Sequence, residues 1–224
     1  MYAVLGAEEK ALAWLGGDSG VQKMLKPDYQ FWALWAANRT FALMGREDWA
    51  YQVVERLPEC ARYDLLRDTR PEMAELAVQN YRDCNPWLAD PDAMATVTDD
   101  PDKVFNLIQY AWLLKNAGEE AQARQLARQG LDFFQGFCSK NQSVEEQFWL
   151  CADGLGWEAY ALLQDREATL AELRRMIEQE HYRYPVYRDL KTQRRLGFLQ
   201  EDSEYQRLMK IIEDDLAAQL DNVR

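Results

Sequence analysis

Apolar residues recur along most of the chain at the spacing of an α-helix. In segment 102–117 they fall three or four positions apart, at Val104, Leu107, Ile108, Ala111 and Leu114, so one helical face is apolar. No segment between turn signals alternates apolar and polar residues over five or more positions, as a half-buried strand would. The pattern therefore predicts an all-α protein. The other segments with helical spacing are 119–135, 144–163, 166–180 and 203–220.

Helix-start signals help to place the boundaries. Asp100 followed by Pro101 is typical of an N-cap and a first helical turn, because proline there loses no hydrogen bond. Ser143 and Glu146 have the spacing of a capping box. We expect connecting segments at 16–27, 84–100 and 181–202. The expected helices lie near 7–15, 28–44, 47–57, 59–68, 71–83, 102–117, 119–135, 144–163, 166–180 and 203–220.

The helices fall into internal repeats. Residues 2–15 align without gaps on 41–54, and further copies follow at 114–127 and 160–173. Because the second and third copies are separated by about two repeat lengths, we expect a divergent repeat around 59–98. The residues at the shared turn position are Gly6, Gly45, Gly118 and Gln164.

Each copy has the features of a helical hairpin. A glycine ends the first helix in three of the copies, since glycine takes the left-handed conformation of a helix C-cap without a steric penalty. The second helix carries a small residue, Ala11, Ala50 or Ala123, which allows the two helices to approach closely. A single hairpin cannot bury its outer face, so we expect neighbouring hairpins to stack.

These copies resemble the tetratricopeptide repeat, a helix–turn–helix unit of about 34 residues. Phe41 and Tyr160 match its turn-facing aromatic position, and Ala50 and Ala123 match its small second-helix position. The copies depart from the family in lacking its closing proline. The resemblance implies a single domain, 1–224, folded as an α-α superhelix. Its stacked hairpins would lie near 2–15, 28–57, 59–98, 102–135 and 144–180, before a C-terminal capping helix at 203–220.

The last part of the chain narrows this resemblance. Residues 161–178, ALLQDREATLAELRRMIE, are followed from Leu199 by an L-x-x-D-x-x-Y-x-x-L-x-x-I helix. This looks like the end of the repeat arrays that follow the effector domain in bacterial winged-helix transcriptional regulators and in some adenylate cyclases. Because its first turn is expected already at Gly6, we expect that the chain opens inside a repeat. The resemblance implies the C-terminal, partner- or signal-sensing part of a larger bacterial regulatory protein.

The resemblance also implies a binding groove. In the family, the first helix of each hairpin lines a concave surface, and aromatic and arginine side chains are frequent anchors of interfaces. The expected partner is a protein or peptide segment, and a homodimer is an alternative. The matching positions here are Trp32, Trp35, Arg39, Phe105, Trp112, Lys115, Asn116 and Glu158.

The charge of the chain affects the choice of partner. There are 26 Lys and Arg residues against 38 Asp and Glu, a net charge of −12. This field repels nucleic-acid phosphates and weakly favours a basic partner, so we expect no direct nucleic-acid binding. The one basic region is 182–195, whose interleaved aromatics would also suit nucleic acid or an acidic partner. We expect it instead to pair with neighbouring acidic helices.

Membrane and compartment signals are few. No run of about 18 apolar residues is present, so we expect no membrane-spanning segment. The opening MYAVLGAEEK has no basic region before an apolar core, so we expect no signal peptide. Reduced, buried thiols and a cytoplasmic location are the expected state, whereas two local disulfides would indicate the periplasm, as in a membrane-anchored parent protein. The four cysteines are Cys60, Cys84, Cys138 and Cys151.

Little in the sequence points to catalysis. Gly154, Gly156 and Ala159 match a loose G-x-G-x-x-A phosphate motif, but no strand is predicted before it, and we expect these glycines to allow close helix packing. His181 is the single histidine, which excludes two-histidine chemistry. Acidic pairs such as Asp99 and Asp100 fall in caps or on polar helix faces. We therefore expect no cofactor, no metal and no enzymatic activity.

Three interpretations of function remain open. The leading one is a non-enzymatic protein-interaction or signal-sensing module. The second is a self-association or spacer domain of a membrane-anchored transcriptional regulator or cyclase. The third is an all-helical enzyme with an acidic cleft.

Overall fold

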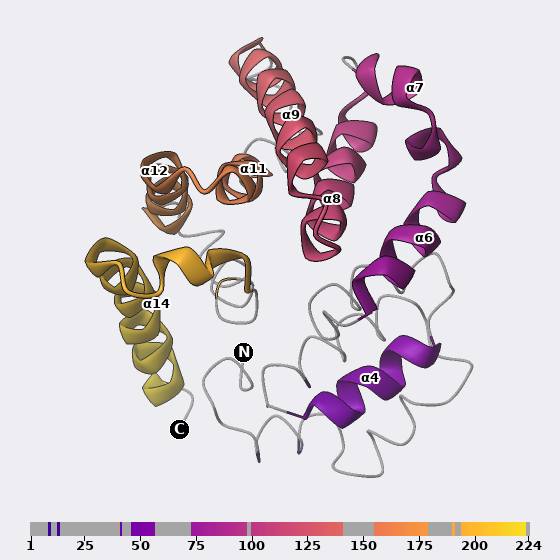
Figure 1. Ribbon diagram of the computed structural model, residues 1–224. Coiled ribbons are helices and arrows are strands. Elements are labelled where there is room, and N and C mark those ends of the chain that lie inside the picture. The colour runs from indigo at the N-terminus through magenta and orange to yellow at the C-terminus, as the bar shows by residue number, and fades with distance from the viewer. Residues whose placement is uncertain are drawn as a thin grey trace.

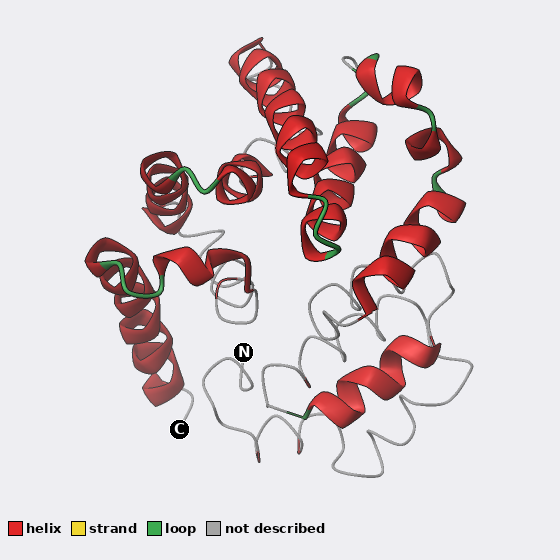
Figure 2. Cartoon of the chain, viewed as in Figure 1, coloured by secondary structure: helices red, strands yellow, loops and turns green. Residues whose placement is uncertain are grey.

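All regular structure in the described part of the chain is helical. The structure is a computed structural model. It describes residues 9, 13, 41, 46–56, 73–97, 100–140, 155–178, 190 and 194–222. Figure 2 shows helices joined by short loops, and none of these residues lies in a strand. The prediction of an all-α protein is confirmed.

The helix bounds follow the predicted segments closely where both can be compared. Those predicted near 47–57, 71–83, 102–117, 166–180 and 203–220 are each present. The α-helices are α4 (Glu47–Arg56), α6 (Ala74–Cys84), α7 (Pro91–Ala95), α8 (Pro101–Asn116), α9 (Glu120–Lys140), α11 (Leu155–Leu163), α12 (Arg166–Glu178) and α14 (Ser203–Asn222), and the 3₁₀ helices are η2 (Pro86–Ala89) and η5 (Arg194–Leu199). Most of the segments expected at 7–15, 28–44 and 59–68 lies outside the described residues.

Two expected connecting segments contain helix. Segment 84–100 holds η2 and α7, and segment 181–202 holds η5. The start of α7 repeats the chemistry of the start of α8, since Asp90 accepts hydrogen bonds from the backbone N–H of Asp92 and Ala93 at 2.9 and 3.3 Å. A helix of five residues is too short to show helical periodicity, so only this Asp-Pro signal marks it.

The turns between paired helices share one geometry. The N–H of Glu119 donates to the carbonyl of Leu114 at 2.8 Å, and the N–H of Asp165 donates to the carbonyl of Tyr160 at 3.0 Å. The aligned pair in the earlier copy, Arg46 to Phe41, has the same bond at 2.9 Å. Three segments that align in sequence therefore close their turns with the same hydrogen bond.

The residue at the turn is left-handed in both copies where the structure describes it. Gly118 has a φ of 87° and Gln164 a φ of 57°. The predicted left-handed cap is confirmed at Gly118, and the same conformation is imposed on a residue with a Cβ at Gln164. The turn geometry is therefore maintained where the glycine is not.

The small residues at the aligned second-helix position are buried. Ala50 and Ala123 are 0% and 1% exposed, as their small size in the alignment predicts. Helix α9 lies close to α8 at Gly130, where a Cβ atom would lie 2.8 Å from the Ile108 side chain. By contrast, a Cβ at Gly156 would make only ordinary contacts, the shortest at 3.8 Å, so the expected need for a glycine there is not met.

The helices follow one another in chain order around an arc (Figure 1). Helices α8 and α9 pack together, α11 packs on both of them and on α12, and α12 packs on α14. The buried apolar residues form one cluster that runs from Phe41 to Leu216. Helix α8 lies between α6, α9 and α11, and every residue from Leu107 to Leu114 is buried. The single apolar stripe predicted for this helix is therefore only part of its buried surface.

The expectation of four reduced cysteines is wrong at Cys84. This residue, the last of α6, is disulfide-bonded. Its partner is a cysteine whose side chain lies outside the described residues. The spacing of the cysteines allows such a bond but does not require it, so the thiol state had no decisive signal in the sequence.

Candidate functional site

The expected groove residues from two successive hairpins meet at Trp112. This indole lies on α8, and its side chain is buried, with 2% of its surface exposed. Its Nε1–H has no hydrogen-bond acceptor among the described residues. We call the group formed by Gln109, Trp112, Lys115, Glu158 and Arg195 the Trp112 cluster.

A buried ion pair forms one side of the Trp112 cluster. The Arg195 guanidinium on η5 lies 2.8 Å from the carboxylate of Glu158 on α11, and these side chains are 4% and 13% exposed. Gln109 on α8 donates to the same carboxylate oxygen at 2.8 Å. The guanidinium carbon of Arg195 lies 4.8 Å from the centroid of the Trp112 ring, within the range of a cation–π contact. The ion pair thus ties η5 to both α8 and α11.

Lys115 forms the more accessible side of the cluster. Its ammonium lies 4.9 Å from the centroid of the Trp112 ring, so the same indole has two cations beside it. Burial lowers the pKa of Lys115. Attraction to Glu120 raises this pKa and repulsion from Arg124 lowers it, and both effects are weaker than that of burial. Lys115 has no ion pair with a carboxylate among the described residues. It is a partly desolvated cation with no described carboxylate at ion-pairing distance, and Glu120 attracts it only from farther away.

The other expected groove residues are distributed as follows. Phe105 is half-buried and packs against the core, so it is not an exposed anchor. Asn116 is exposed at the last position of α8. Trp32, Trp35 and Arg39 lie outside the described residues. The structure therefore brings together Trp112, Lys115 and Glu158.

The burial of Trp112 corrects the expectation that it is an exposed anchor. The physical reason is η5, whose Arg195 contacts the ring and whose Leu196 and Leu199 are both fully buried. An open groove at this point would need the surface that η5 occupies. The accessible part of the expected groove is the end of α8, at Lys115 and Asn116.

Two residues of the cluster were not among the expected groove residues. No sequence pattern marks Gln109 as part of a site, because it lies off the apolar stripe of its helix, where polar residues are common. Arg195 belongs to the basic region 182–195, which was expected to pair with acidic helices. That expectation is confirmed for Arg195 by its ion pair with Glu158. The rest of the region, apart from Leu190 and Arg194, lies outside the described residues.

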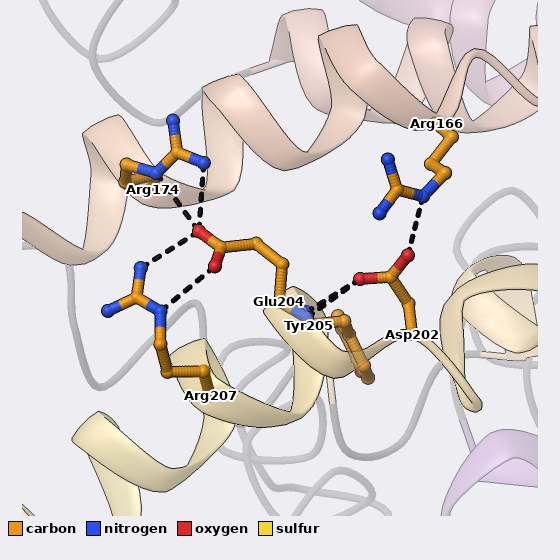
Figure 3. A network of polar contacts seen from close by, with 6 residues as sticks. All are labelled: Arg166, Arg174, Asp202, Glu204, Tyr205 and Arg207. Carbon is orange, nitrogen blue, oxygen red and sulfur yellow. Dashed lines mark hydrogen bonds and ion pairs between the residues drawn. The ribbon is translucent and has the colours of Figure 1, made fainter.

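A second polar network joins α12 to the start of α14 (Figure 3). Arg174 of α12 and Arg207 of α14 both bind the carboxylate of Glu204, each at 2.8 Å. Hydrogen bonds from Arg207 and Arg174 lower the pKa of Glu204 to about 2. Asp202 accepts from the N–H of Glu204 and of Tyr205 and binds Arg166 of α12 at 2.5 Å. The network positions the C-terminal helix and places no group in a cleft.

Neither a metal site nor a membrane-spanning helix is present among the described residues. The described residues contain no cluster of three or more His, Cys, Asp or Glu side chains placed to hold a metal ion. Among the described helices, none combines the length and apolar character needed to cross a bilayer. The glycine motif at 154–159 begins outside the described residues, and Leu155–Leu163 is helical rather than a strand–turn unit.

Comparison of the chain with known proteins found no matching family model, no matching curated protein and no matching solved structure.

Proposed function

We propose that the chain is a non-enzymatic binding module built from stacked helical hairpins, which contacts a protein partner near the end of α8. The observation that carries this proposal is the Trp112 cluster. Three of its residues, Trp112 and Lys115 on α8 and Glu158 on α11, lie at positions that the resemblance to tetratricopeptide repeats assigns to the binding surface of the first helices of the hairpins. Within this cluster, Lys115 is a partly desolvated cation next to the exposed Asn116.

Three aligned copies with the same turn hydrogen bond support a stacked-hairpin scaffold. In such a scaffold each hairpin positions its neighbour, so side chains from several hairpins are held at fixed spacing without a catalytic centre. A curved, superhelical arrangement of the whole chain and a place at the C-terminus of a larger bacterial regulatory protein are parts of the same proposal.

The disulfide at Cys84 bears on the compartment. Disulfides persist in oxidising compartments and are rare in the cytoplasm, where thiols are kept reduced. This favours the periplasmic alternative over the cytoplasmic location first expected. We therefore propose that the chain is the extracytoplasmic, sensing part of a membrane-anchored regulator.

Site-specific photo-cross-linking in cells tests the proposal. A photoreactive amino acid is placed at Asn116, and, as a matched control, at Arg128, which is exposed on α9. The expected result is a discrete adduct from position 116 that is absent from position 128. An adduct between two copies of the chain would show self-association instead. Equal, diffuse labelling from both positions would contradict a partner site at this end of α8.

A further inference from the structure

The charges of the Trp112 cluster are unevenly matched. Two cations, Lys115 and Arg195, lie beside the same indole, and the single carboxylate of the cluster belongs to Glu158. That carboxylate is already ion-paired with Arg195 and accepts a hydrogen bond from Gln109. Lys115 therefore has no described carboxylate at ion-pairing distance, although burial has removed part of its hydration and Glu120 attracts it only from farther away.

Trp112 adds a second group whose bonding is incomplete. Its Nε1–H is buried and has no acceptor within the described part of the chain. A buried donor without an acceptor costs about 1–3 kcal/mol relative to a hydrogen-bonded one. The partly desolvated Lys115 ammonium lies beside the Trp112 ring, and both it and the indole N–H are hydrogen-bond donors. A negatively charged acceptor could therefore accept a hydrogen bond from each.

We propose that the Trp112 cluster binds a carboxylate, which enters beside Lys115 and accepts hydrogen bonds from the Lys115 ammonium and the Trp112 Nε1–H. The inference rests on the proposed function and names the chemistry of the group that is recognised. A carboxylate has two oxygens, and the cluster offers two donors of different geometry. The flexible stem of Lys115 allows its ammonium to move aside while remaining bonded to the ligand.

A carboxylate fits this position better than a phosphate does. Trp112 and Lys115 lie in the last turns of α8, where exposed carbonyl groups give the helix end a partial negative charge. The chain as a whole carries a net charge of −12. Both features oppose a dianion more strongly than a monoanion.

The indole N–H resonance of Trp112 provides a direct test. It is assigned by its loss in Trp112→Phe and is then followed while the protein is titrated with acetate, a small monocarboxylate. A second titration uses an acetylated and amidated Gly-Glu-Gly peptide, whose only carboxylate is a side chain, with Gly-Gln-Gly as the neutral control. The variant is Lys115→Met, and the matched control is Lys103→Met, which removes an exposed lysine of the same helix.

The expected result is a shift of the Trp112 resonance that saturates as carboxylate is added. The affinity derived from this titration should be about tenfold or more weaker in Lys115→Met and unchanged in Lys103→Met. Lys115→Arg, which keeps the charge, should retain binding and serves if Lys115→Met is unstable. A response to the glutamate peptide alone would assign the carboxylate to an acidic side chain of a partner, and a response to both probes would include small carboxylates.

No saturable shift with either probe, or equal shifts in Lys115→Met and Lys103→Met, would overturn the inference. This failure is distinct from failure of the proposed function. A partner cross-linked from Asn116 with no response to carboxylates would leave the binding module in place and remove only the carboxylate.

Discussion

Replacing Arg195 by methionine should destabilise the protein by about 3–5 kcal/mol, because it leaves a buried carboxylate without its counter-ion. The Arg195 and Glu158 side chains are only 4% and 13% exposed, so water cannot replace the lost partner at Glu158. Gln109 would remain as a hydrogen-bond donor to this carboxylate. For a chain of this size, the loss corresponds to a fall of about 6–20 °C in melting temperature.

The double variant separates the ion pair from simple packing. When Glu158→Leu is combined with Arg195→Met, both charges are removed and the desolvation penalty disappears with them. The double variant should therefore lie within about 1 kcal/mol of the wild type, although each single change is costly. Lys210→Met is the matched control, since Lys210 and Asp214 form an exposed pair at 72% and 66% exposure. Its cost should be below about 1 kcal/mol.

Equilibrium unfolding in urea, followed by far-ultraviolet circular dichroism, measures each free energy. The reasoning is refuted if Arg195→Met costs no more than Lys210→Met. It is also refuted if the cost of the double variant equals the sum of the two single costs, because the two charges would then not interact.

Three other predictions concern the turns, the C-terminal network and the thiols. Gln164→Gly should stabilise the protein by about 0.5–1 kcal/mol and Gly118→Ala should destabilise it by about 1 kcal/mol, because both positions are left-handed. A Cβ at Gly118 would meet nothing within 4 Å, so the cost there comes from the backbone conformation and not from a clash. Melting temperatures that change in opposite directions in the two variants would confirm this. Because the pKa of Glu204 is lowered to about 2, its network should contribute stability above about pH 4.5 and lose it as the pH falls toward 2. The urea midpoint of Glu204→Gln should therefore fall less between pH 6 and 3 than that of the wild type. Parallel pH dependences of the two midpoints would exclude this role. Intact mass should rise by about 2 Da per disulfide on reduction of the unfolded chain, and an unchanged mass would show that Cys84 is a free thiol.

The local structure of the chain was well predicted because it depends on neighbouring residues. Helical periodicity placed α8 and α14, and the glycine signal placed the turn at Gly118. Alignment with the other copies placed Gln164 at the turn position, but its left-handed conformation was not predicted, since glutamine itself does not favour it.

The burial of the site could not be predicted in the same way. Trp112 is covered by Arg195, whose side chain reaches it from a segment far along the chain. Periodicity within α8 identifies one apolar face, whereas the packing of η5, α9 and α11 around the helix decides that its other side is buried too. The same limit applies to Cys84, because thiol pairing depends on which segments the fold brings together.

The yield of the Asn116 photo-cross-link in two lysine variants tests the central claim most directly. If a partner binds at the end of α8 through the Trp112 cluster, Lys115→Met should reduce the yield of adduct about tenfold, because it removes a charged contact next to the probe. Lys103→Met, at the start of the same helix, should leave the yield unchanged. Equal yields in the two variants would contradict a role of the Trp112 cluster in partner binding.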